Sequence, residues 1–204
     1  YDFYMDGNHL YFLIGDVSGK GVPASLFMAI TRSLFRTLSQ HVLSPAKIVT
    51  EMNNSISDNN ESNMFVTLIV GILDLETGIL KLCNAGHNPP ILIYPDGQVS
   101  YLEFKTQIFV GVVEDFKYSD EEVVLEKESK LFLYTDGVTE AENINKELYG
   151  EEKLLGMLSD NASSDVRTTV NVVVDSIASH VKEAEASDDL TILLIQYEPG
   201  TANS

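Results

Sequence analysis

Short blocks of apolar residues, separated by turn residues, run along most of the chain. Blocks of this length bounded by Gly, Pro, Asn or Asp are typical of β-strands. They predict strands at residues 1–4, 9–14, 64–73, 79–85, 91–94, 99–103, 121–125, 131–134 and 190–197. The first two blocks flank a turn at residues 5–8, which predicts a hairpin.

After Pro23 the spacing of the apolar residues changes from short blocks to a regular repeat. Apolar residues recur at every fourth position, at Leu26, Ile30, Leu34 and Leu38, with Phe27 and Phe35 alongside. This spacing predicts a helix over residues 23–40 with one broad apolar face. Further helices are predicted at residues 45–56, 151–158 and 164–182, and residues 57–63 read as a polar loop.

The order of these elements indicates the fold class. The strands are joined by short turns, and the helices gather at two places instead of alternating with the strands. Short connections favour antiparallel pairing, because parallel neighbours need long crossovers. We therefore expect an α+β protein with helices packed on antiparallel sheets. At 204 residues the chain is long enough for one domain with a substantial core.

The charge balance is strongly acidic. Asp and Glu number 31 against 13 Lys and Arg, for a formal charge of −18 and an isoelectric point near 4.4. Such a surface repels phosphate backbones, so we expect no nucleic-acid partner. If the substrate is a phosphate ester, bound cations could neutralise the field at the site.

Cysteine content and hydropathy suggest where the protein works. Cys83 is the only cysteine, so no disulfide forms within the chain, and a reducing cytoplasm is the expected location. No run of about 18 apolar residues and no basic-then-apolar leader occurs, so no membrane segment is predicted. The chain begins at Tyr1 inside strand-like sequence, and we interpret it as a fragment of a longer protein.

Aspartates stand next to three of the predicted strands. Asp16 and Asp136 follow strands, and the pair Asp188-Asp189 precedes the last one. Strand ends in one sheet can converge at one edge, and convergent carboxylates repel unless cations join them. Oxygen ligands favour Mg²⁺, Mn²⁺ or Ca²⁺ over zinc. The structural alternative is that each aspartate is only a turn residue, and spacing alone does not decide between the two.

Two other motifs, a glycine-rich stretch and a Cys–His pair, are weaker indications of a catalytic site. The glycine-rich stretch at 15–21 has three residues between Gly15 and Gly19-Lys20, where a P-loop needs four before Gly-Lys-Ser/Thr. Cys83 and His87 lie four residues apart, but Cys83 falls in an apolar strand and is expected to be a buried structural residue.

Four segments resemble, in order, the signature of one enzyme family. They are GDVSGKGVPA at 15–24, NAGHNPP at 84–90, LYTDGVTE at 133–140 and DDLT at 188–191. They resemble the SpoIIE/RsbU-type phosphatases, the bacterial branch of the PPM (protein phosphatase 2C) superfamily. The resemblance extends from Tyr1 to about residue 197.

The resemblance implies a four-layer αββα sandwich, two antiparallel sheets flanked by helices, over residues 1–198, with 199–204 as a disordered tail. It implies two metal ions, Mn²⁺ or Mg²⁺. Asp16 would bridge both ions, the Val17 carbonyl would bind one, and Asp136 and Asp188 would complete the site. Asp189 would support it. A water activated by the two metals would then hydrolyse phosphoserine or phosphothreonine.

Two features depart from the family pattern. Relatives carry Gly-Gly-Asp just before the Tyr-Asp pair, and that aspartate is a further metal-site acid. This chain begins at Tyr1, and Asp2 is not assumed to replace that acid. Phe109-Val110-Gly111 stands where many relatives have Pro-Leu-Gly.

The resemblance also implies partners. The substrate would be a phosphorylated anti-anti-sigma (STAS) protein in a partner-switching pathway, and relatives carry a sensor or regulatory domain upstream. We hypothesise that the helix at 23–40 couples such a domain to the site, so that Leu34 or Leu38 replaced by alanine would change regulated activity. Relatives can form homodimers. The alternatives are an inactive PPM-like binding module and a hydrolase of small phosphate esters or nucleotides.

Overall fold

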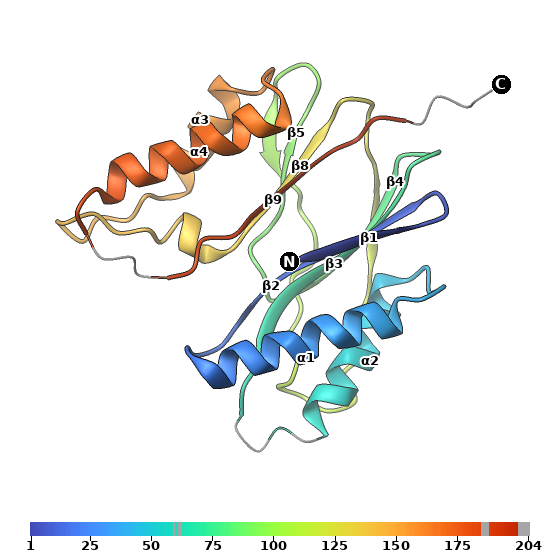
Figure 1. The fold of residues 1–204 in the computed structure, drawn as a ribbon. Coiled ribbons are helices and arrows are strands. Elements are labelled where there is room, and N and C mark those ends of the chain that lie inside the picture. Colours follow the sequence, from blue (N-terminus) through green and yellow to red (C-terminus); the bar gives the residue numbers. More distant parts are fainter. Residues whose placement is uncertain (59, 61–62, 185–187, 200–204) are drawn as a thin grey trace. The chain divides into compact units, whose positions relative to one another are not determined.

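The computed structural model describes residues 1–58, 60, 63–184 and 188–199, which form two compact units (Figure 1). The first unit is built mainly from Tyr1–His87 and Phe104–Leu125, and the second from Asn88–Glu103 and Glu126–Glu198. Each unit contains its own β-sheet, its own pair of helices and its own hydrophobic core.

The first unit has a five-stranded sheet in the order β1-β2-β3-β4-β7, with every neighbouring pair antiparallel. Its strands are β1 (Asp2–Asp6), β2 (His9–Val17), β3 (Val66–Asp74), β4 (Ile79–Ala85) and β7 (Glu121–Val124). In the register of β2 and β3, Asp16 lies opposite Thr67 and Val17 lies opposite Val66.

Helices α1 (Val22–Leu38) and α2 (Pro45–Ser57) pack on one face of this sheet (Figure 1). Leu13 and Val17 of β2 belong to the core under the helices, together with Met52 of α2. Because side chains alternate along a strand, Asp16 faces the opposite side of the sheet. Helix α2 begins with Pro45 after the N-cap Ser44, whose side chain accepts a hydrogen bond from the Lys47 amide.

The predicted apolar face of α1 is only half correct. Leu34 and Leu38 pack against the core, but Leu26 is 61% exposed and Ile30 is 55% exposed. With 3.6 residues per turn, a strict four-residue spacing drifts by about 40° at each step, so the earlier positions rotate away from the sheet. Phe27 and Phe35, which were predicted beside the four-residue repeat, do pack inward, and Ala24, Met28 and Thr31 complete the packed stripe.

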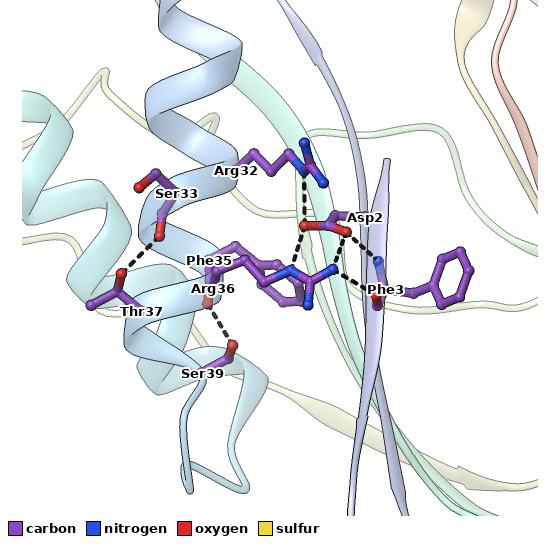
Figure 2. A network of polar contacts seen from close by, with 8 residues as sticks. All are labelled: Asp2, Phe3, Arg32, Ser33, Phe35, Arg36, Thr37 and Ser39. Atoms are coloured by element: carbon purple, nitrogen blue, oxygen red, sulfur yellow. Dashed lines mark hydrogen bonds and ion pairs between the residues drawn. The ribbon is translucent and has the colours of Figure 1, made fainter.

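An ion-pair network joins β1 to α1 (Figure 2). Asp2 is only 6% exposed, and its carboxylate accepts hydrogen bonds from Arg32 Nε at 2.9 Å, Arg36 Nε at 2.6 Å and the Phe3 amide at 2.9 Å. Arg36 also lies over the ring of Tyr4, 4.8 Å from its centroid. Both oxygens of Asp2 are thus bound by α1 and the local backbone, so Asp2 joins β1 to α1.

The second unit has a four-stranded antiparallel sheet in the order β6-β5-β8-β9. Its strands are β5 (Ile91–Ile93), β6 (Val99–Tyr101), β8 (Lys130–Tyr134) and β9 (Ile192–Gln196), and its helices are α3 (Glu151–Asp160) and α4 (Val166–Val181). Phe132, Leu154 and Val173 form part of the core between sheet and helices.

Lys130 anchors the connection between α3 and α4. Its side chain is buried, and Nζ donates to the carbonyls of Ala162 and Ser164 at 2.6 Å each. Burial lowers the pKa of Lys130, and the two carbonyls offset part of the desolvation cost.

The predicted fold class is confirmed, since the structure has two antiparallel sheets, each with a helix pair. Several boundaries differ from the prediction. The strand β1 extends to Asp6, into the turn predicted at 5–8, and β6 ends at Tyr101. The difference that bears on the site is that β2 continues to Val17, so Asp16 and Val17 lie in the strand and not in the glycine-rich loop. The predicted tail falls largely on residues 200–204, and the predicted loop at 57–63 includes 59, 61 and 62; these residues lie outside the described part of the chain. No helix among the described residues combines the length and apolarity needed to cross a bilayer.

Candidate metal centre

Asp16 is held near the end of β2 by a close approach of two strands. A Cβ added at Gly15 would lie 2.7 Å from the Thr67 carbonyl oxygen, so only glycine allows β2 and β3 to pair here. Val17 follows on the opposite face, with its side chain in the core of the first unit. Val17 therefore has only its main-chain carbonyl to offer a metal.

A polar pair, the partly buried Thr67 and the buried His87, lies beside Asp16. Thr67 Oγ1 and His87 Nδ1 are 2.9 Å apart, and Thr67 Oγ1 also donates to the Asp16 carbonyl at a long 3.5 Å. His87 is 3% exposed, and Asn84 shapes its loop by accepting from the His87 amide and donating to the His87 carbonyl.

The sequence analysis missed Thr67 and assigned no role to His87. The available signal was a threonine inside the apolar strand at 64–73, where a polar side chain next to the strand that carries Asp16 needs a partner.

Asp136 and Asp188 meet in the second unit. Asp136 begins the short 3₁₀ helix η1 (Asp136–Val138) directly after β8, and Asp188 precedes β9. Because β8 and β9 are antiparallel neighbours, the end of one and the start of the other lie at the same edge of the sheet. One carboxylate oxygen of Asp136 lies within 4.8 Å of one from Asp188.

The backbone around this pair is tightly packed. A Cβ added at Gly137 would lie 2.3 Å from the Asp189 carbonyl oxygen, so the turn after Asp136 needs glycine. Thr135 Oγ1 donates to the same carbonyl at 3.2 Å. The Asp189 amide donates to Asp188 Oδ1 at 2.8 Å. Asp189 thus orients Asp188 through its main chain.

These residues fit a divalent cation. Asp136 Oδ1 is buried and has no hydrogen-bond donor among the described residues. Burying a carboxylate oxygen without a hydrogen-bond donor reduces the free energy of unfolding unless a cation binds that oxygen. Asp188 is exposed, so the pair opens to solvent. Two nearby carboxylates with an unfilled acceptor suit the hard, oxygen-binding ions Mg²⁺ and Mn²⁺.

Cys83 does not offer a second catalytic group. It is fully buried, and burial raises the pKa of its thiol to about 12. Gln107 Nε2 approaches Sγ at 3.8 Å. A thiol in this environment stays protonated at neutral pH, which supports the structural role expected for it.

Comparison with known proteins agrees with the predicted family. Residues 6–198 match the family model described as Stage II sporulation protein E (SpoIIE). Phosphoserine phosphatase RsbU of Bacillus subtilis is 25% identical over 197 residues, which cover 96% of this chain and 58% of RsbU.

Solved structures show the same fold. The SiaA-PP2C domain of Pseudomonas aeruginosa superposes with a TM-score of 0.86 at 20% identity, covering 97% of this chain and 79% of that domain. RsbX in complex with magnesium gives a TM-score of 0.69 at 19% identity, covering 95% and 84%. The structural matches confirm the PP2C-type fold, and the family model confirms the predicted SpoIIE family.

The matched regions are parts of longer proteins. The chain spans between 35% and 58% of the length of three curated relatives. Substrates and partners of the whole protein are therefore matters for proposal.

Proposed function

Because the chain belongs to the Stage II sporulation protein E (SpoIIE) family, we propose that it is a metal-dependent serine/threonine protein phosphatase that hydrolyses phosphoserine or phosphothreonine on a protein. One observation carries this proposal. Asp136 and Asp188 lie within 4.8 Å of each other, and the buried oxygen of Asp136 lacks a donor among the described residues.

In this proposal two ions, Mn²⁺ or Mg²⁺, bind in a single phosphatase domain of residues 1–198. Asp16, the Val17 carbonyl, Asp136 and Asp188 would hold these ions, and Asp189 would support Asp188. Such ions, when bound, make water a better nucleophile and neutralise phosphoryl oxygens. The magnesium complex of RsbX supports this choice of metals.

The reaction itself is a simple hydrolysis. The oxygen of water forms a bond to phosphorus, the ester bond to the serine oxygen breaks, and that oxygen leaves with a proton as the serine hydroxyl. The protein's own contribution is to hold the carboxylates in place: Gly15 and Gly137 permit the close backbone contacts, and Thr135 and Asp189 orient Asp188. With a formal charge of −18, the chain needs bound cations to accept a phosphate group.

For the substrate we propose a phosphorylated anti-anti-sigma (STAS) protein in the cytoplasm, under the control of a sensor or regulatory domain outside this chain. The name of RsbU as a phosphoserine phosphatase supports the phosphoserine part of this proposal.

The test is Mn²⁺-dependent phosphate release from a phosphoserine STAS protein by the wild type and by Asp136→Asn. Both should be measured in this chain and in a longer protein in which a Gly-Gly-Asp segment has been placed before Tyr1. Asp160→Asn, an exposed acid at the end of α3, is the matched control and should keep full activity. Turnover that requires metal and is lost only in Asp136→Asn would support the phosphatase. Absence of turnover in every protein, with fold and manganese intact, would leave an inactive binding module as the better account.

A further inference from the structure

Two aromatic rings stack at the surface of the first unit. The rings of Phe65 and Phe109 have centroids 5.0 Å apart and planes 19° apart. Phe109 is 38% exposed, and Phe65 is half-buried. A stacked aromatic pair that remains partly exposed can bind a further apolar group, because that contact buries more of the apolar surface of its rings.

This pair lies on the same sheet face as Asp16. Ser18 directly follows β2 and Phe65 directly precedes β3; the Ser18 amide donates to the Phe65 carbonyl at 2.9 Å, and the Phe65 amide donates to Ser18 Oγ at 2.9 Å. Phe65 is two residues from Thr67, which lies opposite Asp16. Residues two apart on a strand share a face and are about 7 Å apart, so Phe65 flanks the position of Asp16.

The exposed ring is held rigidly. Val110, next to Phe109, exchanges two backbone hydrogen bonds of 3.0 Å with Val66. The hydroxyl of Tyr118 donates to the Phe109 carbonyl at 3.2 Å. The ring also packs against Gly86, where an added Cβ would be 1.9 Å from Phe109 Cδ1. A ring fixed in this way loses little conformational freedom when a ligand contacts it.

We propose that Phe109, stacked on Phe65, determines substrate specificity by receiving a large apolar side chain next to the phosphoserine of the protein substrate. This inference rests on the proposed function. An extended polypeptide advances about 3.3 Å per residue, so a side chain one or two positions from the phosphoserine spans the separation between Asp16 and Phe65. An uncharged ring can accept such a side chain on a strongly acidic protein without electrostatic cost.

A pair of synthetic peptides tests the proposal. Each peptide carries one phosphoserine. In the first peptide the two residues on either side of the phosphoserine are leucine, and in the second they are asparagine. The wild type should favour the leucine peptide in kcat/KM, and Phe109→Ala should reduce that preference about tenfold, mainly through KM. Phe109→Leu should restore most of the preference for the leucine peptide. Phe3→Ala, which removes another exposed phenylalanine of the first unit, should leave the preference as it is.

Binding provides a readout that does not need turnover. The same peptides, labelled with a fluorophore, can be titrated against the wild type and Phe109→Ala with Mn²⁺ present. A leucine preference that falls in Phe109→Ala supports the proposal, even if no peptide is hydrolysed and the phosphatase assignment itself fails. Equal binding of both peptides by the wild type would overturn it. The proposal would also be overturned if Phe109→Ala weakened the binding of a nucleoside monophosphate and left the binding of both peptides unchanged. The rings would then stack on a base.

Discussion

The guanidinium of Arg36 holds the carboxylate of Asp2 with two of its nitrogens, Nε on Oδ2 at 2.6 Å and Nη2 on Oδ1. Nη2 also donates to the Phe3 carbonyl at 2.8 Å. This fork fixes the second residue of the chain to the last turn of α1, 34 residues later (Figure 2). A paired, buried carboxylate of this kind strongly favours its charged form, chiefly through its hydrogen bonds with Arg36, and its pKa falls from an ordinary value of 3.8 to about 2.

The first prediction concerns stability against pH. Because the folded pKa of Asp2 lies below its unfolded value, its stabilisation is fully present above about pH 4 and disappears as the pH falls toward 2. The shift corresponds to about 2 kcal/mol. Asp2→Asn should therefore lower the free energy of unfolding by about 2 kcal/mol at pH 7 in urea titrations. It should also weaken the pH dependence between 4 and 2.

Asp6→Asn provides the control for this measurement. Asp6 ends the same strand, but its side chain is 43% exposed and its neighbour His41 is 88% exposed. Exposed ion pairs contribute little to the free energy of unfolding, so Asp6→Asn should change that free energy by less than about 1 kcal/mol. Equal losses in both variants would show that the fork between Asp2 and Arg36 is not a major source of stability.

The second prediction concerns metal-free stability. Without a cation, Asp136 and Asp188 repel each other across at most 4.8 Å. Asp188→Asn should therefore raise the melting temperature in EDTA by roughly 2–4 °C. In the wild type, Mn²⁺ at 100 times its Kd should add about 2.7 kcal/mol of stability, and Asp188→Asn should lose most of that gain. Identical manganese stabilisation in both proteins would exclude Asp188 as a ligand.

The third prediction concerns the turn after Asp136. Gly137→Ala places a methyl group 2.3 Å from a backbone oxygen, which must move and carry Asp188 with it. We expect a loss of about 1–3 kcal/mol in unfolding free energy and weaker Mn²⁺ binding by calorimetry. Gly156→Ala in α3 is the matched control, because no atom lies within 4 Å of the added methyl. It should stabilise the protein by about 0.5–1 kcal/mol.

The fourth prediction concerns the link between Thr67 and His87. Thr67→Val keeps the shape of the side chain but removes the partner of His87 Nδ1. The loss should be about 1–2 kcal/mol in stability. Because Thr67 lies opposite Asp16, metal-dependent turnover should fall as well. Thr67→Ser retains the hydroxyl and should recover the turnover; if it does not, the methyl group and not the hydrogen bond matters.

Much of the fold follows from local patterns. The strands at 64–73 and 79–85 and the helix at 45–56 were predicted to within a few residues of β3, β4 and α2. Period and turn chemistry act within a few residues, so they can be recognised without tertiary information. The candidate acids Asp16, Asp136 and Asp188 could be proposed for the same reason, because an aspartate next to an apolar strand is a local signal.

Other features depended on contacts between distant residues. The four-residue repeat from Leu26 to Leu38 identified α1, but packing on the sheet decided that Phe27 would turn inward and Leu26 outward. Periodicity specifies a face only to within the drift of the helix, and the neighbouring sheet selects the final rotation.

The sequence by itself determined the elements, the antiparallel class and the acids that could bind a metal. Only the tertiary structure decided that Asp2 would be bound by Arg36, that Thr67 would pair with His87 and that Phe109 would stack on Phe65. The physical reason is the same in each case. Strand register and the packing of helices on sheets set which side chains meet, and both arise from interactions summed over the whole unit rather than from any short segment.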